Sequence, residues 1–157
     1  MAAKDQSMRK EVEKGGKWDY SIDKRNTKGM KQIVKNYGWP TIKLVGKRAS
    51  KNAWLLVQHA DHDKPFQKRV LKILNEIMTN SPDSIDKSGI AYLTDRILVA
   101  EGKKQEFGTQ FCINQKDQLI PRPIRDRKNV NKRREQYNLD PIEQYLEDAK
   151  KYIPLKT

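Results

Sequence analysis

Apolar residues recur at helical spacing in one segment of this chain after another, and each segment ends at a glycine, a proline or a polar turn. Because such residues are three or four positions apart, they share one face of a helix, and that face must be buried. The repetition of these segments predicts a mainly α fold, a compact helical bundle of five to six helices. The clearest stripe consists of Phe66, Val70, Ile73, Leu74 and Ile77.

The stop signals give the helix boundaries. Gly38-Trp39-Pro40 ends one apolar stripe and Gly102 ends another. Asp63 has the position of a helix N-cap, with Pro65 just inside the helix. One or two further helical turns are predicted within 130–137, a connector at 41–46 and a loose tail at 154–157. The main predicted helices are 4–14, 23–37, 50–60, 63–79, 85–101 and 140–152.

One region alternates apolar and polar residues instead. Phe107, Phe111 and Ile113 alternate within 106–113, and a second short apolar segment, 118–120, follows the polar turn 114–117. Alternation over two segments joined by a polar turn is typical of a hairpin. The sequence therefore predicts a small β-hairpin near 106–120.

Length and composition favour one folded domain. A chain of 157 residues has the size of a single domain, so we expect one domain over 1–157. It has no run of about 18 apolar residues and no apolar signal core near its start, so we expect a cytoplasmic protein without membrane contact. Cys112 is the one cysteine, and its place in the alternating segment predicts a half-buried structural thiol.

The formal net charge is +13, and one segment concentrates it. Seven basic residues and one acidic residue lie in 122–134, which makes this segment the strongest local candidate for binding an anion. A nucleic-acid partner is supported by charge alone, because neither a zinc finger nor an RNA-recognition motif is present. Basic residues elsewhere are spread along helices and predict a solvated face; they include Lys24, Lys28, Lys31 and Lys35.

A tight polar group marks the best candidate for a site. Gln58 and His59 end an apolar helix, and Asp61 and Asp63 lie in the turn that follows. Imidazole and carboxylate groups at this spacing can transfer protons or hold a metal ion. The alternatives are that Asp63 simply caps a helix and that His59 bonds a backbone carbonyl. Capping needs one aspartate, so it leaves the other polar residues unexplained.

Metal binding is the weaker use of this group. His59 and His62 are the only histidines, which is fewer than a stable zinc site normally needs. Alternate carboxylates suit a hard cation such as Mg²⁺, but no ligand set is complete and no metal or other cofactor is identified. The adjacent His62-Asp63 resembles the pair of the HD phosphohydrolases, yet His59 lies too close to it for that family's layout.

Acid–base chemistry fits the residues of this polar group better than metal binding does. A histidine titrates near neutral pH, and a neighbouring carboxylate can orient its ring and stabilise its charged form. The predicted catalytic residues are therefore His59, with Asp61 or Asp63 as its orienter. Arginines hold phosphates and carboxylates through paired hydrogen bonds, which predicts an anionic small-molecule substrate. The arginines considered for this role are Arg96, Arg122, Arg133 and Arg134.

Several motifs together form a recognisable series. It comprises Asp5-Gln6…Arg9, Asn26-Thr27, Tyr37-Gly-Trp-Pro-Thr41, Gln58-His-Ala-Asp61 with Asp63, Phe66-Gln67, Tyr92-Leu-Thr-Asp-Arg96, Gly108-Thr-Gln110, and Pro121-Arg-Pro-Ile124 with Asp126 and Arg133-Arg134. With this series the chain resembles, over nearly its whole length, a bacterial family known only as a domain of unknown function. The resemblance implies a bacterial or phage-like protein and transfers no activity, cofactor or catalytic residue.

The resemblance does supply polar positions that a core does not require. Polar groups from separate segments that meet in one cleft would form an active site, whereas the same groups sealed in the core would fix helix packing. The leading hypothesis is a small hydrolase or transferase acting on an anionic substrate. The alternative is a non-catalytic module whose 122–134 segment binds nucleic acid or an acidic partner. The predicted substrate-binding residues are Gln58, Gln67, Asp95, Arg96, Gln110, Arg122, Arg133 and Arg134.

Overall fold

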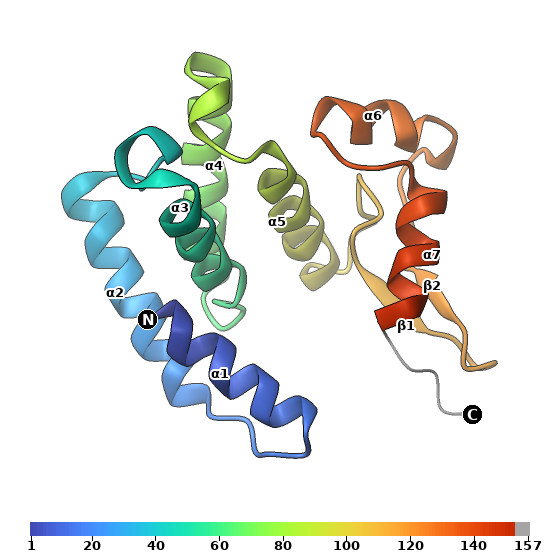
Figure 1. Cartoon of the computed structure of the whole chain (residues 1–157). Helices are drawn as coiled ribbons and strands as arrows, with labels where there is room; N and C mark the ends of the chain where they lie inside the picture. Colours follow the sequence, from blue (N-terminus) through green and yellow to red (C-terminus); the bar gives the residue numbers. More distant parts are fainter. Residues whose placement is uncertain (153–157) are drawn as a thin grey trace. The chain divides into compact units, whose positions relative to one another are not determined.

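The computed structural model describes residues 1–152, and its chain divides into two compact units (Figure 1). The first unit ends at Asp86 and the second begins at Lys87. The expectation of one domain over 1–157 stays a prediction. The predicted loose tail at 154–157 lies outside the described residues.

The first unit is built from helices alone. A short 3₁₀ turn, Pro82–Ser84, follows the last of them. Three of the helices begin at a side chain that accepts a backbone N–H: Asp19 from Ser21, Thr41 from Leu44 and Asp63 from Phe66. The helices are α1 (Ala2–Glu13), α2 (Tyr20–Tyr37), α3 (Ile42–Gln58) and α4 (Lys64–Asn80).

The start of α3 corrects one prediction. We expected a connector at 41–46 and a helix over 50–60, but Thr41 is the cap and the helix already begins at Ile42. Gly46 has φ 79° and ψ 162°, so it kinks the helix. A glycine tolerates this positive φ, so the chain can break from helical geometry at Gly46 and resume it directly afterwards.

The core of the first unit lies between these helices. The predicted stripe of α4 is confirmed in part: Phe66, Val70 and Leu74 are buried, whereas Ile73 and Ile77 are half-buried. Burying each large apolar side chain stabilises the fold by about 1.5–3 kcal/mol. The other buried apolar residues that α1, α2 and α3 and their connections contribute are Met8, Met30, Trp39, Ala53, Leu56, Val57 and Ala60.

The second unit combines helices with the predicted hairpin. Phe111, Cys112 and Ile113 pair with Pro121, Ile120 and Leu119 in an antiparallel register. The hairpin is confirmed but is shorter than expected, because 106–110 forms a loop. Cys112 is half-buried, as predicted. The elements are α5 (Lys87–Ala100), β1 (Phe111–Ile113), β2 (Leu119–Pro121), a 3₁₀ turn (Arg127–Asn129), α6 (Val130–Gln136) and α7 (Ile142–Tyr152).

The fold class is therefore confirmed as mainly α with one small antiparallel hairpin. Within residues 1–152 the structure has seven α-helices, one more than predicted, because 130–136 forms a helix of its own. Over the same residues, every helix is too short or too polar to cross a membrane.

Candidate functional site

His59 pairs with a carboxylate that sequence spacing did not point to. Its Nδ1 lies 3.0 Å from Oδ2 of Asp5, which is 54 positions away in α1. His59 is the C-cap residue of α3, and its backbone N–H donates to the carbonyl of Leu55. The side chain of Asp5 is 1% exposed and that of His59 11% exposed. The carboxylate of Asp5 is thus fully buried, whereas the ring of His59 keeps a small exposed area.

Two further side chains, Gln6 and Arg9, hold the carboxylate of Asp5 in place through three hydrogen bonds. Gln6 Nε2 donates to Oδ2 at 2.8 Å, and Arg9 donates from Nε to Oδ2 at 3.2 Å and from Nη2 to Oδ1 at 3.1 Å. Arg9 Nη2 also donates to Oδ1 of Asp23 at 3.0 Å, and the guanidinium lies 4.7 Å from the centre of the Trp18 ring. Arg9 is therefore shared between two buried carboxylates, Asp5 and Asp23.

This environment keeps Asp5 ionised. Burial by itself raises the pKa of the carboxyl, but the hydrogen bond from Arg9, the charge of His59 and the bond from Gln6 together bring that pKa below its usual value. An ionised Asp5 fixes the orientation of the His59 ring through Nδ1 and stabilises the imidazolium form. The other nitrogen, Nε2, is on the opposite edge of the ring. Such a pair suits general acid–base chemistry, and it also suits a buried polar network that fixes helix packing.

Asp63, one of the predicted catalytic residues, has the geometry of a helix cap. Its Oδ1 accepts the N–H of Phe66 at 3.1 Å, and its Oδ2 forms an ion pair with Lys31 of α2. The hydrogen bond from Lys31 is the main cause that holds the pKa of Asp63 below its usual value. The capping alternative is thus the one that the geometry of Asp63 supports. His62 is exposed, in the turn before it.

The neighbouring glutamines have contrasting surroundings. Gln67 is 1% exposed, and its Nε2 lies 3.2 Å from the carbonyl of Val57, 3.1 Å from that of Gln58 and 3.4 Å from Oδ1 of Asp61. It thereby caps the last carbonyls of α3, which lack partners within the helix. Oε1 of Gln58, in contrast, is buried and has no hydrogen-bond partner. A buried acceptor without a partner costs about 1–3 kcal/mol, so it calls for an explanation.

Asp95 of α5 holds a loop in the second unit. It is fully buried and accepts from the backbone N–H groups of Glu106, Phe107 and Thr109 at 2.7, 3.1 and 2.9 Å. The Thr109 hydroxyl adds a fourth bond at 3.0 Å. Burial raises the pKa of Asp95 above its usual value, and these donors limit the rise. Gly108, within the loop, has φ 74°, and a Cβ there would collide with Ile142.

The two adjacent arginines of α6 serve the same loop. Arg134 is 1% exposed and donates to the carbonyl of Phe107 at 2.6 Å and to that of Asp140 at 2.5 Å. Burial lowers its pKa. Arg133 donates to the carbonyl of Glu106 at 3.0 Å and to that of Arg125 at 2.6 Å. Both guanidinium groups therefore bond backbone carbonyls within the unit.

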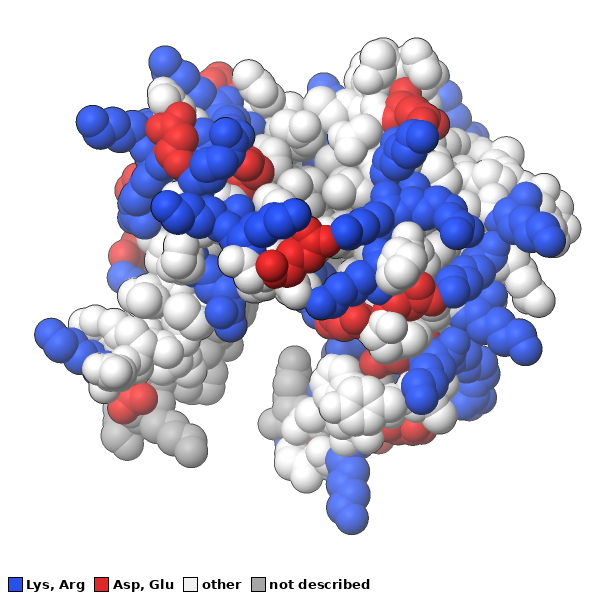
Figure 2. Space-filling view, turned by 180° about the vertical axis from the view of Figure 1, so that it is seen from behind, with Lys and Arg blue, Asp and Glu red and all other residues white. Residues whose placement is uncertain are grey.

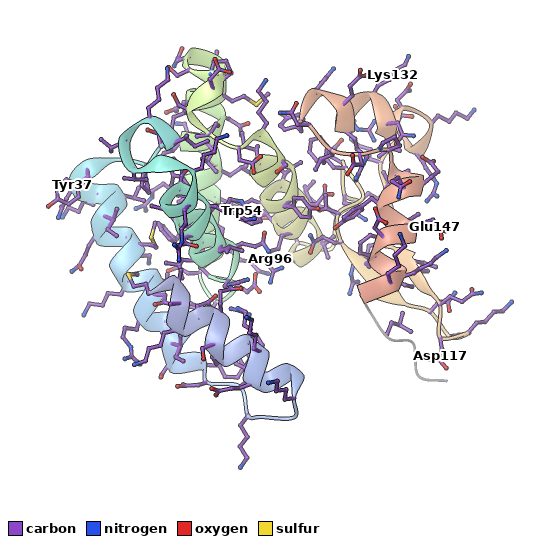
Figure 3. The ribbon with its side chains drawn as sticks, viewed as in Figure 1. Tyr37, Trp54, Arg96, Asp117, Lys132 and Glu147 are labelled. Atoms are coloured by element: carbon purple, nitrogen blue, oxygen red, sulfur yellow. The ribbon has the colours of Figure 1, made fainter. Side chains whose placement is uncertain are left out.

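Gln105 is a fully buried residue of this loop that sequence reasoning missed. Its Oε1 accepts the N–H of Gln110 at 2.9 Å, and its Nε2 donates to the carbonyls of Gln110 at 3.0 Å and Arg122 at 2.7 Å. The side chain of Gln110 donates to the Thr109 hydroxyl at 3.1 Å. Arg122 is exposed, and Arg96 is half-buried on α5 (Figure 3).

The predicted site residues thus fall into two sets. Gln58, His59, Asp61, Asp63 and Gln67 belong to the first unit. The second unit holds Asp95, Arg96, Gln110, Arg122, Arg133 and Arg134. That these sets converge stays a prediction.

Asp5, Gln6 and Arg9 were missed as site residues. One signal was present in the sequence, because Asp5 and Arg9 are four positions apart and an acid and a base at that spacing share a helix face. Within residues 1–152, no three His, Cys, Asp or Glu side chains form a group that could hold a metal ion.

The fold and the site define a mainly helical protein with a buried Asp–His pair in one unit and a carboxylate-clamped loop in the other. The chain belongs to a family of unknown function, DUF6624, whose model matches residues 1–156. This confirms the resemblance to a domain of unknown function. Neither the comparison with curated proteins nor that with solved structures gives a match.

Proposed function

We propose that this chain is a small enzyme, a hydrolase or transferase, in which His59 performs acid–base catalysis and Asp5 orients it. The observation that carries the proposal is the 3.0 Å contact between His59 Nδ1 and an Asp5 carboxylate that is buried yet kept ionised. A purely structural bond to histidine needs only a backbone carbonyl, whereas an ionised carboxylate strengthens the ring as a base.

The proton transfers follow from the orientation of the ring. His59 Nε2 takes the proton of a water molecule or of an acceptor hydroxyl as that oxygen attacks the substrate. Asp5 stabilises the imidazolium that forms, and Nε2 then returns the proton to the leaving group. General acid–base catalysis of this kind contributes about 10²–10⁴ in rate. We also propose that Gln58 Oε1, a buried acceptor without a partner in the residue that precedes His59, receives a substrate N–H or O–H.

The substrate class we propose is anionic. The net charge is +13, and Figure 2 shows Lys and Arg side chains spread over much of the face in view, with acidic side chains in smaller groups. A positive surface raises the local concentration of phosphate- or carboxylate-bearing molecules.

The test compares the two histidines of the chain. The substrates are p-nitrophenyl phosphate, bis(p-nitrophenyl) phosphate and p-nitrophenyl hydrogen succinate. His59→Ala should lower turnover at least 100-fold, the low end of what a general base contributes. His62→Ala, which removes the exposed histidine three positions on, should leave turnover unchanged. Thermal melts of both variants report the fold. If His59→Ala unfolds the chain, or if it retains wild-type turnover, the acid–base proposal is wrong.

The second candidate is the non-catalytic module that binds nucleic acid or an acidic partner through 122–134. Four cations of this segment are exposed and can make phosphate contacts: Arg122, Arg127, Lys128 and Lys132. Arg133 and Arg134 bond carbonyls, and Arg125 bonds Glu106. A plot of the logarithm of the association constant for DNA against the logarithm of the salt concentration should therefore have a negative slope no steeper than about −3.6. Each of the four possible phosphate contacts contributes about −0.9 to that slope.

A further inference from the structure

We propose that a pocket between α1 and α2 binds a small molecule that carries a phosphate or carboxylate group. The pocket has a volume of about 380 Å³, which is in the range of small-molecule sites. Lys4 of α1 and Arg25, Asn26 and Lys28 of α2 line it. It lies entirely within the first unit, and none of its residues was predicted as a site residue.

The charge of the pocket selects an anion. Lys4, Arg25 and Lys28 bring three positive charges to one small concavity. Asp19, the N-cap of α2, interacts with Arg25 and Lys4, but it offsets only one of the three charges. Like charges held close together repel each other, and an anion bound among them removes that repulsion. Arg25 can also hold a phosphate or carboxylate through two parallel hydrogen bonds.

Asn26 supplies an independent observation that points to a ligand. Asn26 lines the pocket, the residue is 5% exposed, and its Nδ2 is buried without a hydrogen-bond partner. An amide N–H left unpaired costs about 1–3 kcal/mol, and the group that satisfies it must be an acceptor. Phosphate and carboxylate oxygens are acceptors. The unpaired donor and the surrounding cations therefore specify the same kind of ligand.

This site goes beyond the acid–base proposal, because anion binding here needs no proton transfer by His59. The pocket would bind its anion equally in an enzyme and in a non-catalytic protein.

Titration of the full chain with inorganic phosphate, pyrophosphate and citrate, followed by calorimetry and by NMR of side-chain amides, tests the proposal. We expect saturable binding of at least one of them, with a shift of the Asn26 side-chain resonance. Arg25→Gln and Lys28→Gln should each weaken binding at least about 10-fold, because each removes a charge-assisted hydrogen bond to the anion. Lys24→Gln is the matched control, because it removes one exposed charge from the same helix outside the pocket lining.

Three outcomes decide the matter. Weakening by Arg25→Gln and Lys28→Gln with less than a twofold change in Lys24→Gln supports the site. Equal weakening in all three, or no saturable binding of any probe, overturns it. Asn26→Ala should also weaken binding of the anion, and a thermal melt shows whether that variant folds. If it does not fold, the comparison of Arg25→Gln and Lys28→Gln with Lys24→Gln decides whether the site exists. His59→Ala should bind like the wild type, so loss of turnover and loss of this site are distinguishable.

Discussion

Asp5 in the first unit and Asp95 in the second are both fully buried carboxylates, but their partners differ in kind. Asp95 accepts only from backbone N–H groups and one hydroxyl, all within the loop 106–109. Asp5 bonds side chains, of which Arg9 and His59 carry or can gain a positive charge. Their pKa values accordingly move in opposite directions, up for Asp95 and down for Asp5.

The comparison separates two uses of a buried carboxylate. Donors without charge can satisfy a carboxylate and fix a loop, but they do not couple it to a group that titrates near neutral pH. A partner histidine does create that coupling. Both aspartates belong to the polar motifs that carried the family resemblance. Membership in a motif therefore does not distinguish a carboxylate that holds a loop from one that belongs to a functional site. The hydrogen-bond partners of the carboxylate make that distinction.

The largest effect on stability should come from removing the Asp95 carboxylate, which holds the loop 106–109 in place. Asp95→Ala leaves three buried backbone N–H groups and the Thr109 hydroxyl without their acceptor, so we expect the second unit to lose about 3–5 kcal/mol of stability. Hydrogen exchange followed by mass spectrometry measures the stability of each unit separately. Tryptophan fluorescence does not report on the second unit, because Trp18, Trp39 and Trp54 are all in the first unit.

Asp5→Asn is the matched change in the first unit. It keeps the shape of the side chain and removes its charge, so it should lower turnover while the first unit remains folded. The measurement is again hydrogen exchange. If Asp5→Asn loses protection against exchange throughout 1–86, to the same extent as Asp95→Ala loses it in the second unit, then both carboxylates serve only to stabilise the fold.

The distinction also explains what sequence could and could not predict. Asp63 as a cap, Pro65 just inside the helix and Gly38 as a stop are confirmed, because each acts through neighbours along the chain. The partnership of Asp5 with His59 crosses 54 positions and depends on how α1 packs. No local pattern encodes that distance.

Two predictions, the connector at 41–46 and the full length of the hairpin, were wrong or overextended. Gly46 resembles a helix stop, yet the chain passes through it and continues as a helix. Phe107 alternates with polar neighbours as a strand residue would, but the 106–110 segment is shaped by Asp95 and Arg134 and forms a loop. For the 106–110 segment, contacts from elsewhere in the unit overrode the alternating pattern.

Asp63 gives a smaller and sharper test, because it was predicted as catalytic and has the geometry of a cap. Asp63→Ala removes the acceptor for the Phe66 N–H and the partner of Lys31, which should cost about 1 kcal/mol of stability. Turnover should not change. Chemical denaturation monitored by tryptophan fluorescence measures the first effect, and the chromogenic assays measure the second. If Asp63→Ala loses only about 1 kcal/mol of stability but its turnover drops strongly, Asp63 is a catalytic residue as first predicted.

The dependence of stability on pH should show the smallest effect, with opposite signs for the two carboxylates. The folded-state pKa of Asp5 is below its ordinary value of 3.8, so its ionised form stabilises the fold above about pH 4. That contribution is lost as the pH falls through the lowered pKa. The folded-state pKa of Asp95 is above 3.8, so its ionisation destabilises the fold, and stability is gained as the pH falls from neutral towards about pH 4.

Urea unfolding at a series of pH values separates the two contributions when the wild type is compared with two isosteric variants. Asp95→Asn should abolish the gain between neutral pH and about pH 4, because the neutral amide has no proton to take up. Asp5→Asn should reduce the loss that begins below about pH 4 and leave the gain above it intact. The reverse assignment, with Asp5→Asn altering only the range above about pH 4, would mean that Asp5 does not carry its charge in the folded state. His59 would then lack the ionised partner on which acid–base catalysis depends.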